Sequence, residues 1–145
     1  MQISLTELEK ELKEEKLRSI YLLYGEEFFL LESSLKKIKK LFGETIKGIN
    51  YIVIDDTNVD SLISNINTPA FGYEKKLIIV KNANIMKKES KGKGKKAGNN
   101  IADNIAEYIT ENIDTINESA ILVFIEETIE KNSLYSTIEK NRNNL

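Results

Sequence analysis

The segment from Ile20 to Phe42 constrains the fold more than any other part of the chain. It begins with the apolar run Ile20–Tyr24, which is typical of a strand that is buried on both faces of a sheet. Gly25 follows, at a position where the chain must turn tightly. Apolar side chains then recur at alternating intervals of three and four residues: Phe28, Leu31, Leu35, Ile38 and Phe42. This spacing indicates one face of a helix, so the segment predicts a strand, a tight turn and a helix.

A strand, a glycine turn and a helix are also the layout of a phosphate-binding loop, whose pattern is G-x-x-x-x-G-K-[ST]. Counted from Gly25, three defining positions carry other residues: Leu30, Leu31 and Glu32. The turn itself carries Glu26 and Glu27, whose charges would repel phosphate. A triphosphate needs backbone N–H groups, a lysine charge and a magnesium ligand. The segment therefore predicts a nucleotide-binding architecture that binds no nucleotide, or else an ordinary strand–turn–helix without that ancestry.

The composition describes a globular chain and excludes several kinds of chemistry. Of 145 residues, 41% are apolar and 30% are charged, and the net charge of −2 does not favour nucleic-acid binding. The chain has no cysteine and no histidine, which excludes disulfides, thiolate metal sites and the commonest general base. No apolar run approaches the ~18 residues of a membrane span, and no signal peptide is indicated. We therefore expect one soluble cytoplasmic domain without metal, cofactor or membrane contact.

Further apolar segments complete an alternating pattern of helices and strands. Beyond the first strand and its helix, the predicted elements are a helix at 5–12, a strand at 51–54, a helix at 59–66, a strand at 77–80, a helix at 101–113, a strand at 119–125 and a helix from about residue 132. The lysine- and glycine-rich run 87–98 predicts a solvated surface loop. The alternation predicts an α/β fold, in which a parallel sheet is flanked by helices on both faces.

Two acidic residues, Asp55 and Asp56, follow the predicted strand at 51–54. Acids at this place hold magnesium in phosphate-loop enzymes and form the acidic pair of phospho-receiver domains, but they also cap helices. A catalytic magnesium would need a second carboxylate or a substrate phosphate nearby, and the next strand ends in Lys81 and Asn82. The sequence therefore favours helix capping, with a phospho-receiver-like module as an open alternative.

The segment Thr68–Tyr73 interrupts the alternation. It contains the only proline of the chain, Pro69, and a Pro-x-Phe-Gly sequence that continues neither a helix nor a strand. Phe71 and Tyr73 thus lie in a loop with polar neighbours. A large apolar side chain on a rigid turn is typical of a protein-docking anchor, although Phe71 could instead pack into the core of its own domain.

Three segments together resemble one family. They read YLLYGEE (21–27) followed by FLLE (29–32), TPAFG (68–72) followed by KKLIIVKNA (75–83), and LVFIEE (122–127). In this order and spacing they are similar to the delta subunit of bacterial DNA polymerase III, a clamp-loader subunit, over its N-terminal domain. The chain departs from the family pattern at Phe28, where proline is frequent, and at Ala70, where a bulkier apolar residue is common.

The resemblance implies a P-loop NTPase-like fold of AAA+ type with a degenerate nucleotide site. The sheet order would be 5-1-4-3-2, and the chain would end before the fifth strand, which would leave the first strand at an edge. Residues 1–145 would form one clamp-binding domain, without the lid and collar domains of the family. The magnesium-holding acids would belong at the end of the third strand, where Lys81 and Asn82 stand.

The function implied by the resemblance is mechanical. The chain would bind and open the beta sliding clamp so that the ring is loaded on primed DNA, with no ATP hydrolysis of its own. The clamp-binding residues would be Thr68, Pro69, Ala70, Phe71, Gly72 and Tyr73. Its partners would be the clamp and the gamma/tau-type and delta-prime-type loader subunits, with DNA reached only through the complex. An inactive bridging subunit and an active phosphate-loop enzyme remain alternatives.

Overall fold

The computed structural model describes residues 5–25, 28–70, 72–83, 85, 96–127, 129–130 and 132–141. Within them, four strands form one sheet in the order β1-β4-β3-β2. The strands are β1 (Ile20–Tyr24), β2 (Tyr51–Ile54), β3 (Lys76–Lys81) and β4 (Ala120–Glu126). Every neighbouring pair is parallel; in the register, Leu122 of β4 lies opposite Ile20 on one side and Ile78 on the other. The parallel sheet and this part of the predicted strand order are therefore confirmed.

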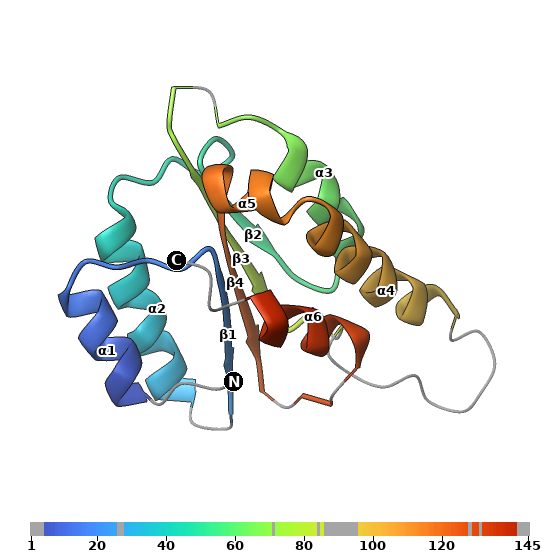
Figure 1. Ribbon diagram of the computed structural model, residues 1–145, viewed down its shortest axis with the longest axis horizontal. Coiled ribbons are helices and arrows are strands. Elements are labelled where there is room, and N and C mark those ends of the chain that lie inside the picture. Colours follow the sequence, from blue (N-terminus) through green and yellow to red (C-terminus); the bar gives the residue numbers. More distant parts are fainter. Residues whose placement is uncertain are drawn as a thin grey trace.

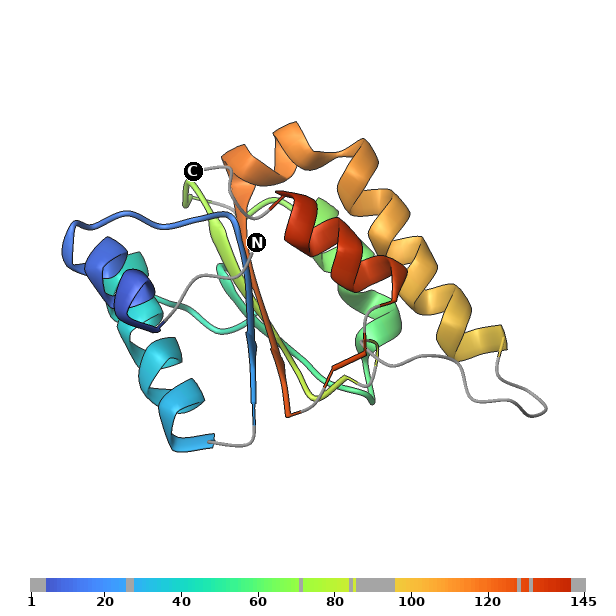
Figure 2. The same cartoon turned by 60° about the horizontal axis from the view of Figure 1, so that its bottom comes forward.

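Helices cover both faces of the sheet, as Figures 1 and 2 show. One face carries α1 (Leu5–Lys13) and α2 (Phe28–Phe42). The other face carries four helices and a 3₁₀ turn: η1 (Val59–Ser61), α3 (Leu62–Asn67), α4 (Lys96–Glu111), α5 (Ile113–Ser119) and α6 (Ser133–Asn141). Figure 2 shows the sheet as a layer between these two groups.

Each face of the sheet has its own hydrophobic core because successive strand residues point to opposite faces. On β4, Ile121, Val123 and Ile125 pack with the side of α1 and α2. Leu122 and Phe124 pack in the larger core on the side of α3 to α6. Every residue of β4 is buried, which explains why the strand is apolar along nearly its whole length.

Two element boundaries were predicted wrongly. The helix expected at 101–113 is divided, since α4 ends at Glu111 and α5 begins at Ile113. The backbone N–H and the side-chain amide of Asn112 both donate to the Tyr108 carbonyl, at 3.0 and 2.9 Å, and the helix ends there. The solvated run expected to reach residue 98 ends earlier, because α4 begins at Lys96. Packing of Ala102 and Ile105 in the core extends this helix into its weak first turn. Residues 87–95 of the run lie outside the described residues.

Asp55 stabilises a turn and does not cap a helix. Its Oδ1 accepts hydrogen bonds from the N–H of Thr57 at 2.8 Å and from its hydroxyl at 2.5 Å. These bonds hold the pKa of Asp55 below its usual range. The residue before η1 is Asn58, whose side chain makes no capping bond to the helix; it instead accepts from the Asp55 N–H at 2.8 Å. The predicted helix cap is therefore wrong, because the acid closes the turn that precedes the helix.

Candidate functional site

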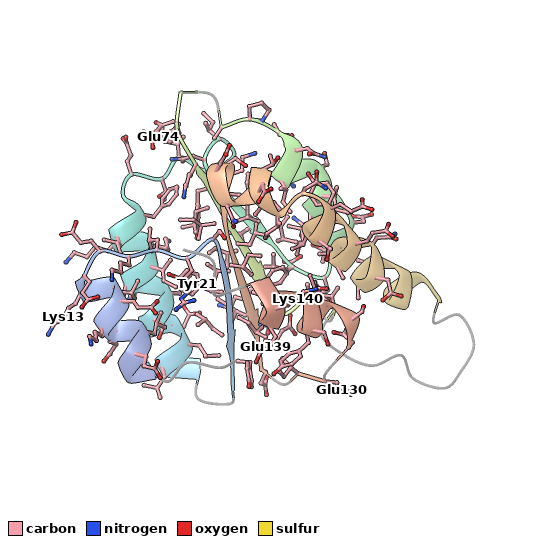
Figure 3. The ribbon with its side chains drawn as sticks, in the orientation of Figure 1. Lys13, Tyr21, Glu74, Glu130, Glu139 and Lys140 are labelled. Atoms are coloured by element: carbon pink, nitrogen blue, oxygen red, sulfur yellow. The ribbon has the colours of Figure 1, made fainter. Side chains whose placement is uncertain are left out.

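The candidate site residues lie at opposite ends of the sheet. Because the strands are parallel, the described residues of the segment 68–73, which precedes β3, lie beyond the amino ends of the strands, at the top of Figure 1. Gly25 follows β1 and Asn82 follows β3, so the position of a phosphate-binding loop lies at the carboxyl ends. In Figure 3, Glu74 stands at the first end and Glu130 near the other. We call residues 68–73 the docking segment and the second region the carboxyl edge.

The docking segment begins where α3 is forced to end. Thr68 takes an extended conformation, with φ −78° and ψ 126°, as the residue before a proline usually does. Its N–H and its hydroxyl both donate to the Ser64 carbonyl, at 3.1 and 2.8 Å. Pro69 has no N–H and cannot continue the helix. The chain therefore leaves α3 at a fixed residue and direction.

The docking segment ends in a tight turn. The N–H of Tyr73 donates to the Ala70 carbonyl at 2.7 Å. Gly72 has a φ of +89°, in the region that favours glycine, and a Cβ there would meet no atom within 4 Å. This position therefore favours glycine because of its backbone conformation and not because a side chain would lack space. Thr68, Pro69 and Gly72 are exposed and Ala70 and Tyr73 are half-buried, whereas Phe71 lies outside the described residues.

A buried lysine holds the start of the docking segment. Lys76 is only 3% exposed, and its ammonium donates to two main-chain carbonyls, that of Asn65 at 2.8 Å and that of Thr68 at 2.6 Å. Burial lowers the pKa of this lysine. The sequence analysis missed Lys76 because a lysine next to an apolar strand is usually a solvated end residue. The one available signal was Pro69, because a proline after a helix has no N–H to donate to a carbonyl of the last turn.

A hollow opens beside the docking segment. It has a volume of ≈ 330 Å³, and its lining includes Tyr73, at the end of the docking segment, and the two residues that lead from there to β3, Glu74 and Lys75. The rest of the lining comes from Leu17, Phe42, Glu44, Asn50 and Ile121. The hollow therefore combines an apolar floor with charged side chains, next to an exposed turn.

At the carboxyl edge, an ion pair joins the two positions that would hold magnesium in a phosphate-loop enzyme. Glu32 stands where that motif has a hydroxyl residue, and Lys81 ends the third strand. The Lys81 ammonium lies 2.8 Å from the Glu32 carboxylate, and the two side chains are 30% and 33% exposed. The pair places a positive charge where a metal ion would need an acid. Among the described residues, no group of three or more acidic side chains is placed to hold a metal ion.

The remaining residues of the phosphate-loop comparison have other roles or lie outside the described part. The N–H of Gly25, whose φ is +139°, donates to the Glu126 carbonyl at 3.2 Å. Leu31, at the lysine position of the motif, packs against the core beneath α1 and α2, and Leu30 is partly exposed. Glu26 and Glu27 lie outside the described residues. The structure thus brings Gly25, Leu31 and Glu32 to one edge, without a lysine from the loop itself.

The parallel order β1-β4-β3-β2, with a glycine turn between β1 and α2, is the one that the family resemblance implied for a P-loop NTPase-like fold of AAA+ type. Two solved structures share it. One is the DNA clamp loader delta protein of Bacillus subtilis, with a TM-score of 0.72 and 22% identity. The other is a DNA polymerase III gamma subunit-related protein of Thermotoga maritima, with a TM-score of 0.53 and 15% identity. The match covers 95% of this chain in both cases, and 40% and 44% of the other chains.

The family is given by the sequence comparisons. The model of the family "DNA polymerase III, delta subunit" matches residues 21–144, and the chain belongs to this family. A curated relative, DNA polymerase III subunit delta of Bacillus subtilis, is 32% identical over 85 residues, which are 57% of this chain. The matched part spans about a quarter of that relative, 24% of its length. In the part of this chain that the structure describes, no helix is long and apolar enough to cross a membrane.

Proposed function

We propose that this chain binds the ring-shaped beta sliding clamp through the docking segment and holds one ring interface open for loading on primed DNA. The family supports a role in the clamp loader of DNA polymerase III. Residues 1–145 would then act as its clamp-binding domain. Opening follows if the domain binds the open ring more tightly than the closed one, because only differential affinity shifts such an equilibrium.

The observation that carries this proposal is an exposed turn whose two ends are fixed. Lys76 holds the carbonyl of Thr68 at 2.6 Å, and Tyr73 donates to Ala70 at 2.7 Å. A turn held in this way loses little conformational entropy when it binds, and preorganisation of this kind favours affinity. Phe71 sits in the sequence between these two ends, at the position of the proposed anchor.

The chain would not hydrolyse ATP in this role. At the carboxyl edge, Leu31 packs against the core and Glu32 is paired with Lys81. The lysine and hydroxyl groups that bind a triphosphate in a phosphate-binding loop therefore have no counterpart at these two positions. Hydrolysis would fall to the gamma/tau-type subunits. This chain would contact them and a delta-prime-type subunit, and would meet DNA only through the complex.

The anchor is tested by Phe71→Ala. Truncating a central aromatic anchor costs about 2 kcal/mol or more, so we expect clamp affinity to fall about thirtyfold. The measurement is a titration of the sliding clamp from the same organism by calorimetry or surface plasmon resonance.

The matched control is Phe29→Ala, because Phe29 is 80% exposed on α2 and the substitution is the same. The control should bind the clamp as the parent does. Equal affinity of Phe71→Ala and the parent would refute the anchor. A parent chain that fails to bind the clamp but binds the loader ATPase subunits would instead indicate a bridging subunit.

A further inference from the structure

One main-chain carbonyl near the end of α3 has no N–H partner within the helix. In an α-helix, the carbonyl of residue i accepts from the N–H of residue i+4. The carbonyl of Asn65 would accept from residue 69, which is Pro69 and has no N–H. The Lys76 ammonium reaches this carbonyl at 2.8 Å. A side chain from the start of β3 thus supplies the donor that the proline removes.

The same ammonium also holds the first residue of the docking segment. It lies 2.6 Å from the carbonyl of Thr68, one residue before the proline. Both acceptors are main-chain oxygens, and no carboxylate of the described residues forms an ion pair with Lys76. A buried ammonium needs hydrogen-bond acceptors, and here its acceptors are the helix end and the docking segment. The position of the charge therefore fixes the position of the segment relative to the sheet.

A second contact, from α4, also reaches the end of α3. The hydroxyl of Tyr108, from α4, donates to the side-chain carbonyl of Asn67, the last residue of α3. This bond joins two side chains. The lysine instead bonds to two main-chain carbonyls, one within α3 and one just after it. Of the two contacts, only that of Lys76 constrains the backbone direction at Thr68.

We infer that Lys76 is a positioning residue for clamp binding: its buried ammonium replaces the donor lost at Pro69 and sets the direction of the docking segment. This inference rests on the proposed clamp-binding function. Lys76 itself needs no contact with the clamp. Its contribution to affinity comes from the order that it imposes on residues 68–73 before binding.

The test compares Lys76→Met with the parent chain. Methionine keeps an apolar stem of similar length but has no donor. Clamp affinity should fall about tenfold, which corresponds to ~1.4 kcal/mol, close to the net value of a hydrogen bond. Amide hydrogen exchange in the absence of clamp should become faster at Ala70, Gly72 and Tyr73, while the amides of β3 and β4 stay protected. Lys76→Arg, which keeps the charge and the donors, should restore part of the affinity.

The matched control is Lys36→Met, the same substitution at an exposed lysine of α2. It should change neither the exchange at residues 70–73 nor the affinity. If Lys76→Met does not fold, as judged by loss of protection in β3 and β4, Lys76→Leu replaces it, since leucine also has no donor, and Lys36→Leu becomes the control.

A double-mutant cycle separates positioning from general stability. Pro69→Ala restores an N–H at residue 69 and lets the helix continue through Thr68, so that this N–H donates to the Asn65 carbonyl. Lys76→Met should then cost less affinity in that background than in the parent. An equal cost in both backgrounds, or unchanged exchange at residues 70–73, would overturn the inference. If the parent itself does not bind the clamp, the proposed function fails, and the exchange measurement still decides whether Lys76 holds the segment.

Discussion

The two ends of β3 each carry a lysine, and the two lysines have opposite surroundings. Lys76, at the amino end, is 3% exposed and bonds only to main-chain carbonyls among the described residues. Lys81, at the carboxyl end, is half-buried and forms an ion pair with Glu32. The first lysine orders a loop that projects from the sheet, and the second pairs with an acid where a related enzyme would hold metal and phosphate.

This difference suggests how a fold that usually binds ligands at one end of its sheet can bind a protein at the other end. Open α/β sheets usually bind ligands at the carboxyl ends of their strands. In this chain the carboxyl edge carries a paired acid and lysine and a leucine that packs against the core, whereas the exposed and preordered segment lies at the amino end. Under the proposed function, the sheet keeps its architecture and uses its other end.

Among comparisons between the two ends of the sheet, the largest difference is expected from two glycines with positive φ, one at each end. Gly72→Ala places a Cβ at φ +89° in the docking segment, and Gly25→Ala places one at φ +139° at the carboxyl edge. Strain of this kind costs about 1–2 kcal/mol. We expect Gly72→Ala to weaken clamp binding five- to tenfold, by about 1 kcal/mol or more, because the turn must deform.

Gly25→Ala should lower the unfolding free energy by a similar amount and leave clamp affinity unchanged. Clamp titration and urea denaturation of both variants measure the two effects. Equal losses of clamp affinity in the two variants would remove the functional distinction between the ends.

A smaller effect is expected at the ion pair of the carboxyl edge. Lys81→Met removes a pair whose side chains are about one-third exposed, and pairs of this kind contribute at most about 1 kcal/mol. The unfolding free energy should change by less than that, and clamp affinity should not change. A clamp-binding loss as large as that of Lys76→Met would show that both ends of β3 contribute to the clamp contact.

The smallest effect is expected from nucleotide. Titration with ATP and magnesium, followed by calorimetry or by thermal unfolding, should give no saturable signal, because Leu31 and Glu32 replace the lysine and the hydroxyl residue of the phosphate-binding loop. Thermal unfolding would detect binding, since a ligand that binds only the folded state raises its stability. Saturable binding would contradict the proposed loss of the nucleotide site and would restore the active phosphate-loop enzyme as the better account.

Much of the fold could be predicted because the two central strands, β3 and β4, are buried on both faces. The sequence of β3 is an uninterrupted apolar run, and all four of its central residues are buried: Leu77, Ile78, Ile79 and Val80. The helices were predicted from the spacing of their apolar residues. Contacts between distant residues could not be predicted in this way. The pair of Glu32 and Lys81 joins residues 49 positions apart, and no local pattern relates them.

The same limit explains why the break after α3 was predicted and the contact that supports it was not. Pro69 and Gly72 are local signals of a turn, and they correctly indicated a break after α3. The role of Lys76 depends on the packing that returns β3 to the end of α3. The division of α4 from α5 was missed for a similar reason, since the apolar spacing continues through Asn112 although the helix does not.

The most direct test of the account is a hydrogen-exchange footprint of the sliding clamp on this chain. We predict slower exchange in the complex at Ala70, Gly72 and Tyr73, at the amino end of the sheet, and unchanged exchange at Gly25, Leu30–Glu32 and Asn82, at the carboxyl edge. Protection confined to the carboxyl edge, or no protection of the docking segment in a saturated complex, would contradict the account.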